Sequence, residues 1–381
     1  AARRTGAQAI HPGYGFLSEN AGFADTCAKA GIVFIGPPPA AIRAMGSKSE
    51  AKKIMEKARV PLVPGYHGDD QSPELLAKEA ARIGFPVLIK ASAGGGGKGM
   101  RVVESADKFA DALAGAKREA KAAFADDHVL IEKYLTRPRH IEIQVFADSH
   151  GGCLSLFERD CSIQRRHQKL VEETPSPAID ERLRREIGRT AVEAVKAIRY
   201  CNVGTVEFLL DKDRNFFFME VNTRIQVEHP ITEMVTGIDL VKEQIRIASG
   251  LPLSFKQPDI KLNGHSFECR INAEDPEKFT PCPGQITKYS APGGLGIRVD
   301  SAMEPNAVVV PYYDSLIAKL ITHGRDRQEA MARMRRALDE FVIEGIKTTI
   351  PLHRKIFNDP DFQKGHVSTT FLDRFLAGQS A

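Results

Sequence analysis

The sequence has little net charge, no long apolar run and no signal-peptide pattern. Its 53 lysines and arginines against 49 aspartates and glutamates leave a formal charge of +4, which is too small to favour nucleic acid or an anionic membrane as a partner. No apolar stretch is long enough to span a bilayer, so a membrane protein is not expected. We therefore expect a protein of the cytoplasm, or of the plastid stroma if the source is a plant.

The cysteines also lack a pattern, because none of the six forms a C-x-x-C pair. Such spacing fits a reducing compartment and offers neither a disulfide framework nor a zinc site. Internal repeats and low-complexity tracts are absent as well. Hydrophobic residues make up 42% of the chain and charged residues 27%, as in ordinary globular proteins, and 381 residues suffice for two or three domains.

Signals for regular structure are clearest between residues 71 and 135. Ser72 and Pro73 predict a capped helix that ends at Gly84. Strands are expected over 87–90, 100–103 and 129–133, with a helix from about residue 106. Together they predict a compact α+β domain. Before it we expect a strand in 31–36, a helix over 48–57 and a linker over 61–70.

The rest of the chain predicts more strands and two long helices. We expect a strand of alternating polarity over 141–147 and a helix over 180–198. A hairpin over 204–221 should turn at 211–215. Near the end, Asp326 can cap a helix over about 328–343.

A glycine-rich segment, A-S-A-G-G-G-G-K-G-M, follows the strand that ends at Lys90. A Walker A loop is excluded because Gly99 stands where Ser or Thr should bind Mg²⁺. The dinucleotide fingerprint matches formally, but a strand rather than a helix follows it. A hairpin lid over a triphosphate fits best, and a plain structural loop is the alternative. A phosphate would pair the ammonium of Lys90, and Lys48 is a weaker candidate for the same role.

The predicted hairpin brings carboxylates together. Side chains alternate along a strand, so Glu220, Asn222 and Arg224 share a face, and antiparallel pairing can place Glu207 beside Glu220. Carboxylates among apolar residues repel each other unless a cation joins them, and these oxygen ligands suit Mg²⁺. The alternative is a solvent-facing side of the hairpin.

Three polar residues follow at alternate positions. If the chain stays extended, Arg224, Gln226 and Glu228 share one face, where they could grip an anion and remove its proton. His229 before Pro230 is interpreted as a structural hydrogen-bonding group.

The basic stretch over 158–173 has acidic residues at both ends and no interleaved aromatic residues. It therefore does not indicate nucleic acid binding. We interpret it as a loop that presents cations and glutamine to a small anion, with a surface loop of paired charges as the alternative.

Together the motifs resemble the biotin carboxylase family of the ATP-grasp superfamily. The resemblance extends from H-P-G-Y-G-F-L-S-E-N (11–20) to the C-terminal helices, through the glycine loop, E-K-Y-L (132–135), E-R-D-C-S-I-Q-R-R-H-Q-K, M-E-V-N-T-R-I-Q-V-E-H-P and E-C-R-I-N-A-E-D-P (268–276). It implies a mixed α/β (ATP-grasp) fold. Residues 1–60 would be the remainder of an N-terminal parallel-sheet domain with its linker, 61–135 a small lid domain, and 136–381 a larger antiparallel-sheet domain.

The resemblance also implies roles for individual residues. Glu207, Glu220 and Asn222 would bind Mg²⁺ or Mn²⁺. Glu228 would be the general base. Arg270 would stabilise the enolate-like form of biotin. The residues implied for ATP are Lys48, Lys90, Gly96, Gly97, Met100, Glu132, Lys133, Tyr134, Leu135, His140, Gln164, His167 and Leu209. Those implied for bicarbonate are Lys169, Arg224, Gln226 and Val227, and Tyr14 and Gly15 would lie near the biotin ring.

The implied activity is ATP-dependent carboxylation of biotin with bicarbonate through carboxyphosphate. The expected setting is acetyl-CoA carboxylase in fatty-acid synthesis, with a separate biotin carboxyl carrier protein, carboxyltransferase subunits and a homodimeric full-length form. The alternatives are the same component of another acyl-CoA or pyruvate carboxylase, an ATP-grasp ligase for another carboxylate, half of a carbamoyl-phosphate synthase, or a non-catalytic nucleotide-binding module.

The chain departs from the family pattern at both ends. The family's strand–loop–helix unit before the His11 motif is missing, so we expect an incomplete N-terminal sheet and dimer contact. The chain also ends soon after Phe375, without the M-K-M segment that would carry biotin.

Overall fold

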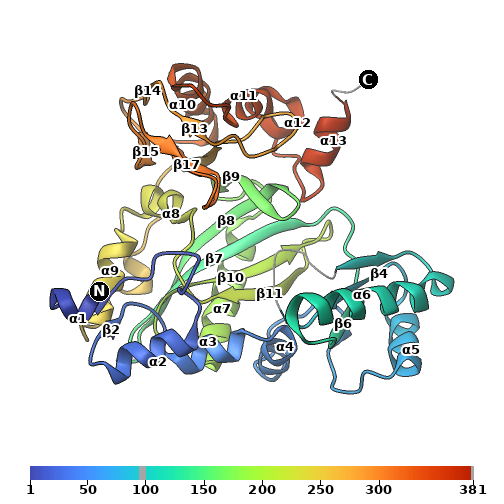
Figure 1. The fold of residues 1–381 in the computed structure, drawn as a ribbon. Coiled ribbons are helices and arrows are strands. Elements are labelled where there is room, and N and C mark those ends of the chain that lie inside the picture. The colour runs from blue at the N-terminus through green and yellow to red at the C-terminus, as the bar shows by residue number, and fades with distance from the viewer. Residues whose placement is uncertain (94–99, 379–381) are drawn as a thin grey trace. The chain divides into compact units, whose positions relative to one another are not determined.

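The computed structural model describes residues 1–93 and 100–378, which belong to two compact units (Figure 1). The first unit comprises residues 1–155, 185–226 and 240–257. The second comprises 156–184, 227–239 and the chain from 258 onward. Each unit is described by itself. The predicted division at residues 60 and 135 stays a prediction.

The N-terminal part of the first unit contains the predicted parallel pairing. Strand β1 (Ala9–Ile10) runs parallel to β2 (Val33–Phe34), so the expected strand near residue 33 is confirmed. The predicted helix over 48–57 is also confirmed as α4, whose N-cap Ser47 accepts a hydrogen bond from the Glu50 backbone N–H. The helices of this part are α1 (Ala2–Thr5), α2 (Ala21–Lys29), α3 (Pro39–Met45) and α4 (Lys48–Lys57).

A four-stranded sheet follows, in the order β3-β6-β4-β5. Helices α5 and α6 pack against it and against each other (Figure 1). Leu76 of α5 and Leu113 of α6 lie in the same apolar core as Val87 and Ile89. The elements are β3 (Gly65–Tyr66), α5 (Pro73–Ile83), β4 (Val87–Ala91), β5 (Arg101–Val103), a 3₁₀ turn (Ala106–Lys108), α6 (Phe109–Phe124) and β6 (Val129–Lys133). The predicted compact α+β arrangement is confirmed.

One local prediction in this region is wrong, and another holds for the position of the cap but not for its hydrogen bond. The supposed linker over 61–70 contains β3, which pairs with β6 and so joins the sheet. Ser72 stands at the N-cap of α5, but its side chain accepts no capping hydrogen bond; its backbone N–H instead donates to Asp70 Oδ1 at 2.9 Å. Gly84, by contrast, ends α5 as predicted, with φ of 81°.

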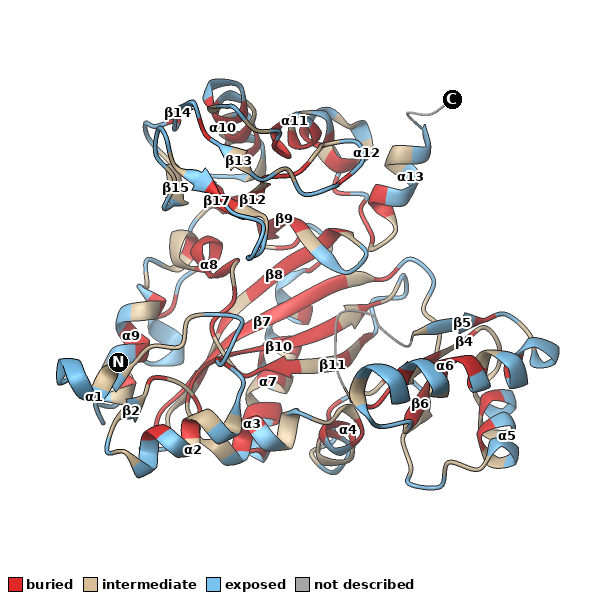
Figure 2. Ribbon diagram, in the orientation of Figure 1, coloured by how far each residue is buried: buried red, intermediate tan, exposed pale blue. Residues whose placement is uncertain are grey.

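Three antiparallel strands, β11-β10-β7, form the central sheet of the first unit. Strands β10 and β11 are the predicted hairpin. Strand β7 was expected to alternate in polarity, but Figure 2 shows β7 and β10 almost wholly buried, and polar Glu142 and Gln144 are fully enclosed. The elements are β7 (Arg139–Ala147), α7 (Glu181–Ala197, from residue 185 in this unit), β10 (Asn202–Leu210), β11 (Phe216–Asn222) and α9 (Leu240–Ala248).

The second unit contains antiparallel strands in the order β8-β9-β12-β17-β15. Its apolar core joins Phe267 of β12 to α10, α11 and α12. The elements are β8 (Cys153–Arg165, from residue 156 in this unit), β9 (Gln168–Thr174), α8 (His229–Thr236), a 3₁₀ turn (Gln257–Asp259, from residue 258 in this unit), β12 (His265–Asn272), β13 (Gly284–Gln285), β14 (Lys288–Ser290), β15 (Ile297–Ser301), β16 (Val308–Val309), β17 (Leu316–Gly324), α10 (Arg327–Glu340), β18 (Val342–Glu344), α11 (Ile350–Asn358), α12 (Pro360–Gln363) and α13 (Phe371–Gly378).

Two predictions for this unit need correction. The basic stretch over 158–173 is not a loop, because it forms most of the paired strands β8 and β9. The helix begins after Asp326, whose side chain accepts from the Glu329 backbone N–H as expected, but it ends at Glu340. Residues 342–344 instead pair with β14 as strand β18.

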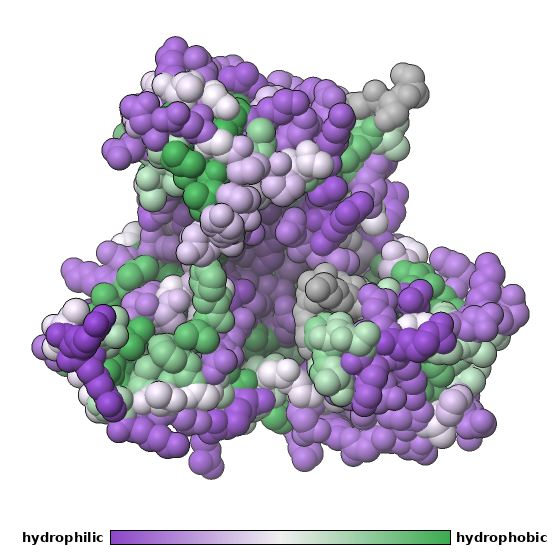
Figure 3. Space-filling model, viewed as in Figure 1, coloured by the Kyte–Doolittle hydropathy of each residue, from purple (hydrophilic) through white to green (hydrophobic). Residues whose placement is uncertain are grey.

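Hydrophilic residues dominate the surface visible in Figure 3. Among the described residues, no helix is both long and apolar enough to cross a membrane.

Candidate active site

Glu207 occupies the middle of the central sheet in the first unit. Its neighbour across the strand on β11 is Glu220, as the sequence predicted, and its neighbour on β7 is Glu142. Asn222 lies two positions beyond Glu220 and therefore on the same face of β11. Two of the predicted metal ligands thus face each other directly, and the third lies next along the strand.

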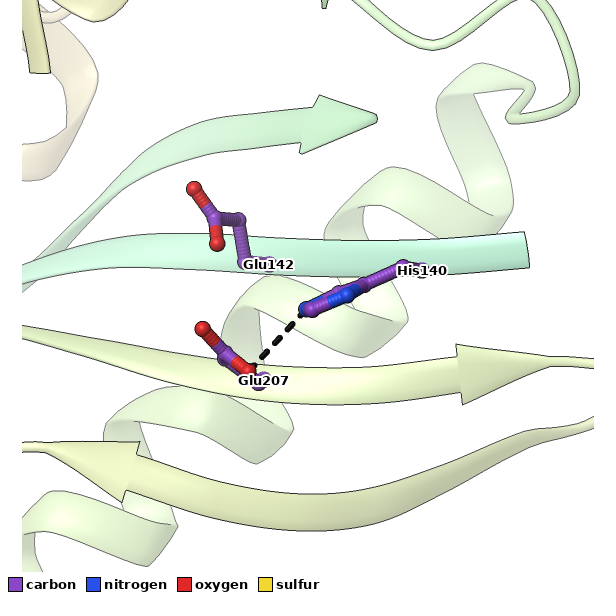
Figure 4. Close-up of side chains that lie close together, drawn as sticks. All are labelled: His140, Glu142 and Glu207. Carbon is purple, nitrogen blue, oxygen red and sulfur yellow. Dashed lines mark ion pairs between the residues drawn. The ribbon is translucent and has the colours of Figure 1, made fainter. Parts of the chain in front are cut away.

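Glu142 and His140 complete this cluster from β7, as Figure 4 shows. His140 Nε2 lies 3.0 Å from Glu207 Oε2, and one ligand atom from each of His140, Glu142 and Glu207 falls within 4.8 Å of the others. All three residues are buried. Sequence reasoning missed Glu142 because alternating polarity along a strand does not show which polar side chains are buried.

Crowding of carboxylates changes their proton affinity. Burial raises the pKa of Glu220, the charge of Glu207 raises it further, and the nearby Lys48 opposes both effects. A divalent cation would relieve this repulsion, since oxygen ligands at a shared position are typical of Mg²⁺ sites. The donor set of Glu207, Glu220 and Asn222 therefore fits such an ion.

Two further side chains contact this set within the first unit. Gln226 Nε2 donates to Glu207 Oε1 at 2.8 Å. Arg224 Nη2 donates to Asn222 Oδ1 at 3.2 Å, and Arg224 Nε pairs with Glu19 at 3.1 Å. The guanidinium of Arg224 is thus held between an amide and a carboxylate.

A second charged cluster in the first unit contains lysines. The ammonium of Lys90 lies 2.5 Å from Glu132 Oε2, and Lys52 donates to Glu132 Oε1. Burial lowers the pKa of Lys48, while the charge of Glu220 opposes that effect. Lys48 is therefore a partly desolvated cation near carboxylates rather than a freely solvated one. Lys52 was missed because two consecutive lysines in a helix resemble a solvated face.

The other residues predicted for nucleotide binding have varied surroundings. Lys133 Nζ donates to the carbonyl oxygens of Gly84 and Phe85, at 2.9 Å each, so its ammonium ties β6 to the end of α5. The Tyr134 backbone N–H donates to the Pro86 carbonyl. Leu135 and Met100 are half-buried, and Leu209 lies opposite His140. Gly96 and Gly97 lie outside the described residues.

The remaining candidates occupy turns and a hairpin. Gln164 is buried on β8 opposite Lys169, whereas His167 is exposed in the β8–β9 turn with φ of 68°. Tyr14 and Gly15 lie in a turn, where the Ser18 hydroxyl donates to the Gly15 carbonyl at 2.7 Å. The ligand-binding roles of these residues stay predictions.

In the second unit, the carboxylate of Glu228 is held between two cations. Lys169 Nζ lies 2.6 Å from its Oε1, and Arg270 Nη2 lies 3.0 Å from its Oε2. Burial alone would raise the pKa of Glu228, but the charges of Lys169 and Arg270 outweigh it and hold the pKa well below the ordinary value. Glu228 is therefore ionised at neutral pH and available as a proton acceptor.

The guanidinium of Arg270 also contacts a second carboxylate. Its Nε donates to Glu172 Oε1 at 2.6 Å. The carbonyl oxygen of Arg270 accepts from the Thr349 hydroxyl at 2.9 Å and from His353 Nε2 at 2.7 Å. The backbone and the side chain of Arg270 are thus both fixed.

Two buried acids behind Arg270 were not predicted. Glu172 and Glu268 lie opposite each other on β9 and β12, and both are fully buried. Neither oxygen of Glu268 has a hydrogen-bond partner among the described residues, and burial raises its pKa well above the ordinary value. Burial also raises the pKa of Glu172, to about 7, although Arg270 pulls it down. Since these residues lie on separate strands, no local pattern could reveal the pair.

An extended chain was the condition for Arg224, Gln226 and Glu228 to share one face, and this condition is not met. The chain leaves the extended conformation after Asn222, bends at Arg224 and turns at residues 227–228 before α8. Alternation of side chains requires a continuous strand. The Val227 carbonyl accepts from Lys319 Nζ at 2.9 Å in this turn.

Comparison with known families gives three matches along the chain. A model described as "Biotin carboxylase, N-terminal domain" matches residues 1–42. "Carbamoyl-phosphate synthase L chain, ATP binding domain" matches residues 47–256. "Biotin carboxylase C-terminal domain" matches residues 268–374.

Several characterised proteins are similar over nearly the whole chain. A biotin carboxylase of Haemophilus influenzae is 57% identical, covering 99% of this chain and 84% of that protein. A pyruvate carboxylase subunit of Methanothermobacter thermautotrophicus is 54% identical, covering 100% and 77%. A mitochondrial methylcrotonoyl-CoA carboxylase subunit of Dictyostelium discoideum is also 54% identical, but the 97% of this chain that matches spans about half, 53%, of that protein.

Solved structures with the same fold include two from bacteria. A biotin carboxylase complex from Campylobacter jejuni, named as a β,γ-ATP complex, has a TM-score of 0.95 and 49% identity, covering 98% of this chain and 83% of the other. The biotin carboxylase domain dimer of 2-oxoglutarate carboxylase from Hydrogenobacter thermophilus has a TM-score of 0.94 and 50% identity, with the same coverage. That dimer was solved in complex with MgADP, ADP and bicarbonate.

Proposed function

Because the chain belongs to the biotin carboxylase family of ATP-grasp enzymes, we propose that it carboxylates biotin with bicarbonate, at the expense of ATP and with Mg²⁺ or Mn²⁺. A related structure holds MgADP and bicarbonate, and another is named as an ATP complex. The observation that supports this proposal most directly is the buried carboxylate of Glu228, which lies between Lys169 and Arg270. A module that only binds nucleotide has no need of such a proton acceptor.

The first unit supplies the groups for metal-bound triphosphate. Glu207, Glu220 and Asn222 would hold the divalent cation, which offsets the charge that develops as a phosphoryl group moves. Lys90 and Lys48 would pair with phosphate oxygens, since both are amines near a carboxylate that they can exchange for an anion. The other residues proposed here for ATP are Gly96, Gly97, Met100, Glu132, Lys133, Tyr134, Leu135, His140, Gln164, His167 and Leu209.

Glu228 would remove the proton of bicarbonate, whose oxygen then attacks the γ-phosphate of ATP and yields carboxyphosphate and ADP. A carboxylate paired with two cations is a weak base. If bicarbonate takes over a contact with Lys169 or Arg270, the pKa of Glu228 rises and proton transfer to it becomes easier. Gln226, Val227 and Arg224 complete the proposed bicarbonate set.

In the second step, carboxyphosphate breaks down to CO₂ and phosphate. The phosphate takes the N1′ proton of biotin, and the biotin nitrogen attacks CO₂ to give carboxybiotin. Arg270 would stabilise the enolate oxygen of biotin, because a guanidinium fixed by carboxylates and by its own backbone is already oriented. Tyr14 and Gly15 are proposed to lie near the biotin ring.

We further propose that biotin arrives on a biotin carboxyl carrier protein and passes its carboxyl group to carboxyltransferase subunits, with the full-length form a homodimer. Acetyl-CoA is the acceptor we favour, as in fatty-acid synthesis. The similarity to subunits of methylcrotonoyl-CoA carboxylase and pyruvate carboxylase supports a second candidate, in which another acyl-CoA or pyruvate is the acceptor. Transfer of labelled carboxyl groups with carboxyltransferases of each class distinguishes these acceptors.

One assay tests the reaction itself: release of ADP in the presence of Mg²⁺ and bicarbonate, with and without free biotin. We expect biotin to stimulate turnover. Stimulation by ammonia or an amino acid instead would assign the chain to another ATP-grasp reaction. The variant Glu228→Gln should lose about 10²- to 10⁴-fold in rate, the usual contribution of a general base. Glu243→Gln is the matched control, because Glu243 is also a buried, ion-paired glutamate but pairs with Arg246 and Ser254.

A further inference from the structure

Two lysines share one carboxylate in the first unit. Lys52 of α4 donates to Glu132 Oε1, while Lys90 at the end of β4 lies 2.5 Å from Glu132 Oε2. The side chains of Lys52 and Glu132 are 5% and 4% exposed, whereas that of Lys90 is 16% exposed. Of the two cations, Lys90 is thus the one that solvent and ligands can reach.

The charge on Glu132 depends on both lysines. Burial alone would raise the pKa of Glu132, but Lys90 and Lys52 lower it to about 2. The three groups therefore carry one net positive charge. If Lys90 leaves, Lys52 still compensates the carboxylate, and no buried charge is left unpaired.

We infer that Lys52 is a positioning residue for nucleotide binding: it keeps Glu132 compensated, so that Lys90 can exchange Glu132 for a phosphate of the nucleotide. The inference rests on the nucleotide-binding part of the proposed function, in which Lys90 pairs with phosphate. Without Lys52, Lys90 would be the remaining ion-pair partner of Glu132. Moving Lys90 to a phosphate would then leave the buried carboxylate without either of these two ion-pair partners, so binding would weaken although Lys52 touches no ligand.

The helix register explains why Lys52 has this role and Lys53 does not. Ala51, Lys52 and Met55 lie on the buried side of α4. Lys53 instead pairs with Asp69 at 2.6 Å and with Glu50 at 3.0 Å, and its side chain is 29% exposed. The two neighbouring lysines thus provide a matched comparison.

Affinity for MgADP, measured by titration calorimetry, tests the inference. We expect K52M to bind MgADP at least about tenfold more weakly than the unsubstituted protein, because truncating one partner of a buried charge pair has effects of this size or larger. The control K53M should bind within about threefold, since exposed ion pairs contribute little. The conservative variant K52R, which keeps the charge, should also bind within about threefold. Unchanged affinity in K52M overturns the inference.

The double variant K52M/E132Q separates charge compensation from a purely structural role. Glutamine removes the charge that holds Lys90 but keeps the shape and an acceptor oxygen, so K52M/E132Q should bind MgADP more tightly than K52M does. An affinity as weak as that of K52M, or weaker, overturns the inference. If K52M fails to fold, as judged by thermal unfolding, the double variant decides, because the buried carboxylate is absent from it; binding of MgADP at least about tenfold weaker than in the unsubstituted protein then overturns the inference.

The same experiment keeps two failures apart. If the unsubstituted protein does not bind MgADP at all, the nucleotide site of the proposed function is refuted and the inference falls with it. If the unsubstituted protein binds MgADP and K52M binds equally well, only the inference is refuted.

Discussion

Replacing Glu172 by glutamine tests how the second unit distributes charge around Arg270. Glu172 is fully buried on β9, with Arg270 as its hydrogen-bond partner at 2.6 Å. Burial raises its pKa from 4.5 to about 7; Arg270 acts against this change, and the charge of Glu228 adds to it. The folded protein therefore holds a proton at Glu172 more tightly than the unfolded chain does.

The sign and size of the effect follow from this difference. Between pH 4.5 and 7 the unfolded chain has lost the proton while the folded protein keeps it, so the free energy of unfolding falls as the pH rises. One pKa unit is worth about 1.4 kcal/mol, and the whole effect is therefore about 3 kcal/mol, most of it between pH 5 and 8. Glutamine at position 172 cannot titrate, so the free energy of unfolding of E172Q lacks this fall with rising pH.

The assay is urea-induced unfolding at pH 5, 6, 7 and 8, followed by two probes to check for a single transition. The difference in unfolding free energy between the unsubstituted protein and E172Q should shift by about 3 kcal/mol in favour of E172Q as the pH rises. A difference that is flat, or that shifts the other way, would refute the reasoning, because it would mean that Arg270 keeps Glu172 ionised.

Glu173, the next residue along β9, is the matched control. It is also buried, and burial alone would raise its pKa, but His265 and Arg327 lower the pKa to about 2. A carboxyl with a depressed pKa contributes stability above its unfolded value of 4.5, and this contribution is lost as the pH falls toward 2. The Glu173 carboxyl itself therefore adds no pH dependence to the free energy of unfolding between pH 5 and 8, in contrast to Glu172.

Three further variants test other parts of the site. Glu220→Gln should reduce Mg²⁺- and ATP-dependent turnover by about 10²-fold or more with an unchanged circular dichroism spectrum; unchanged turnover removes Glu220 from the ligand set. Arg270→Ala should reduce carboxylation of biotin more than bicarbonate-dependent ADP release, and equal losses would contradict its role with biotin. Glu268→Gln should gain unfolding free energy relative to the unsubstituted protein as the pH rises above 4.5, since burial raises the pKa of Glu268; urea titrations showing no gain would contradict this.

Elements with strong local signals could be predicted closely from the sequence. The predicted and observed bounds agree for α4 and β6, and the predicted hairpin of β10 and β11 is present. Strand β3 could not be predicted, because its two residues become a strand only through pairing with β6, which lies more than sixty residues further on. The predicted strand over 141–147 is present as β7, but its alternating polarity could not reveal that its polar residues are buried as well, since their partners are brought together only in the folded state.

The site residues, too, could be predicted where they belong to one local element, and could not where they come from separate elements. Glu207 and Glu220 belong to one hairpin, so a short turn brings them close together, and a register shift between Glu207 and Phe208 then places the two glutamates directly opposite each other. Glu142 and Lys52 come from other elements, and each had an ordinary interpretation as a surface residue. Their importance becomes visible only when a buried partner is identified, namely Glu207 for Glu142 and Glu132 for Lys52.

The segment after β11 shows where a local rule stops applying. Alternation along a strand correctly placed Glu220 and Asn222 on one face, but extending it to residue 228 assumed that the strand continues. The bend at Arg224 ends the alternation, and the segment instead serves two sets of partners: Gln226 contacts Glu207 in the first unit, and Glu228 contacts Lys169 and Arg270 in the second. The partners of this segment thus change between Gln226 and Glu228, where the turn at residues 227–228 begins.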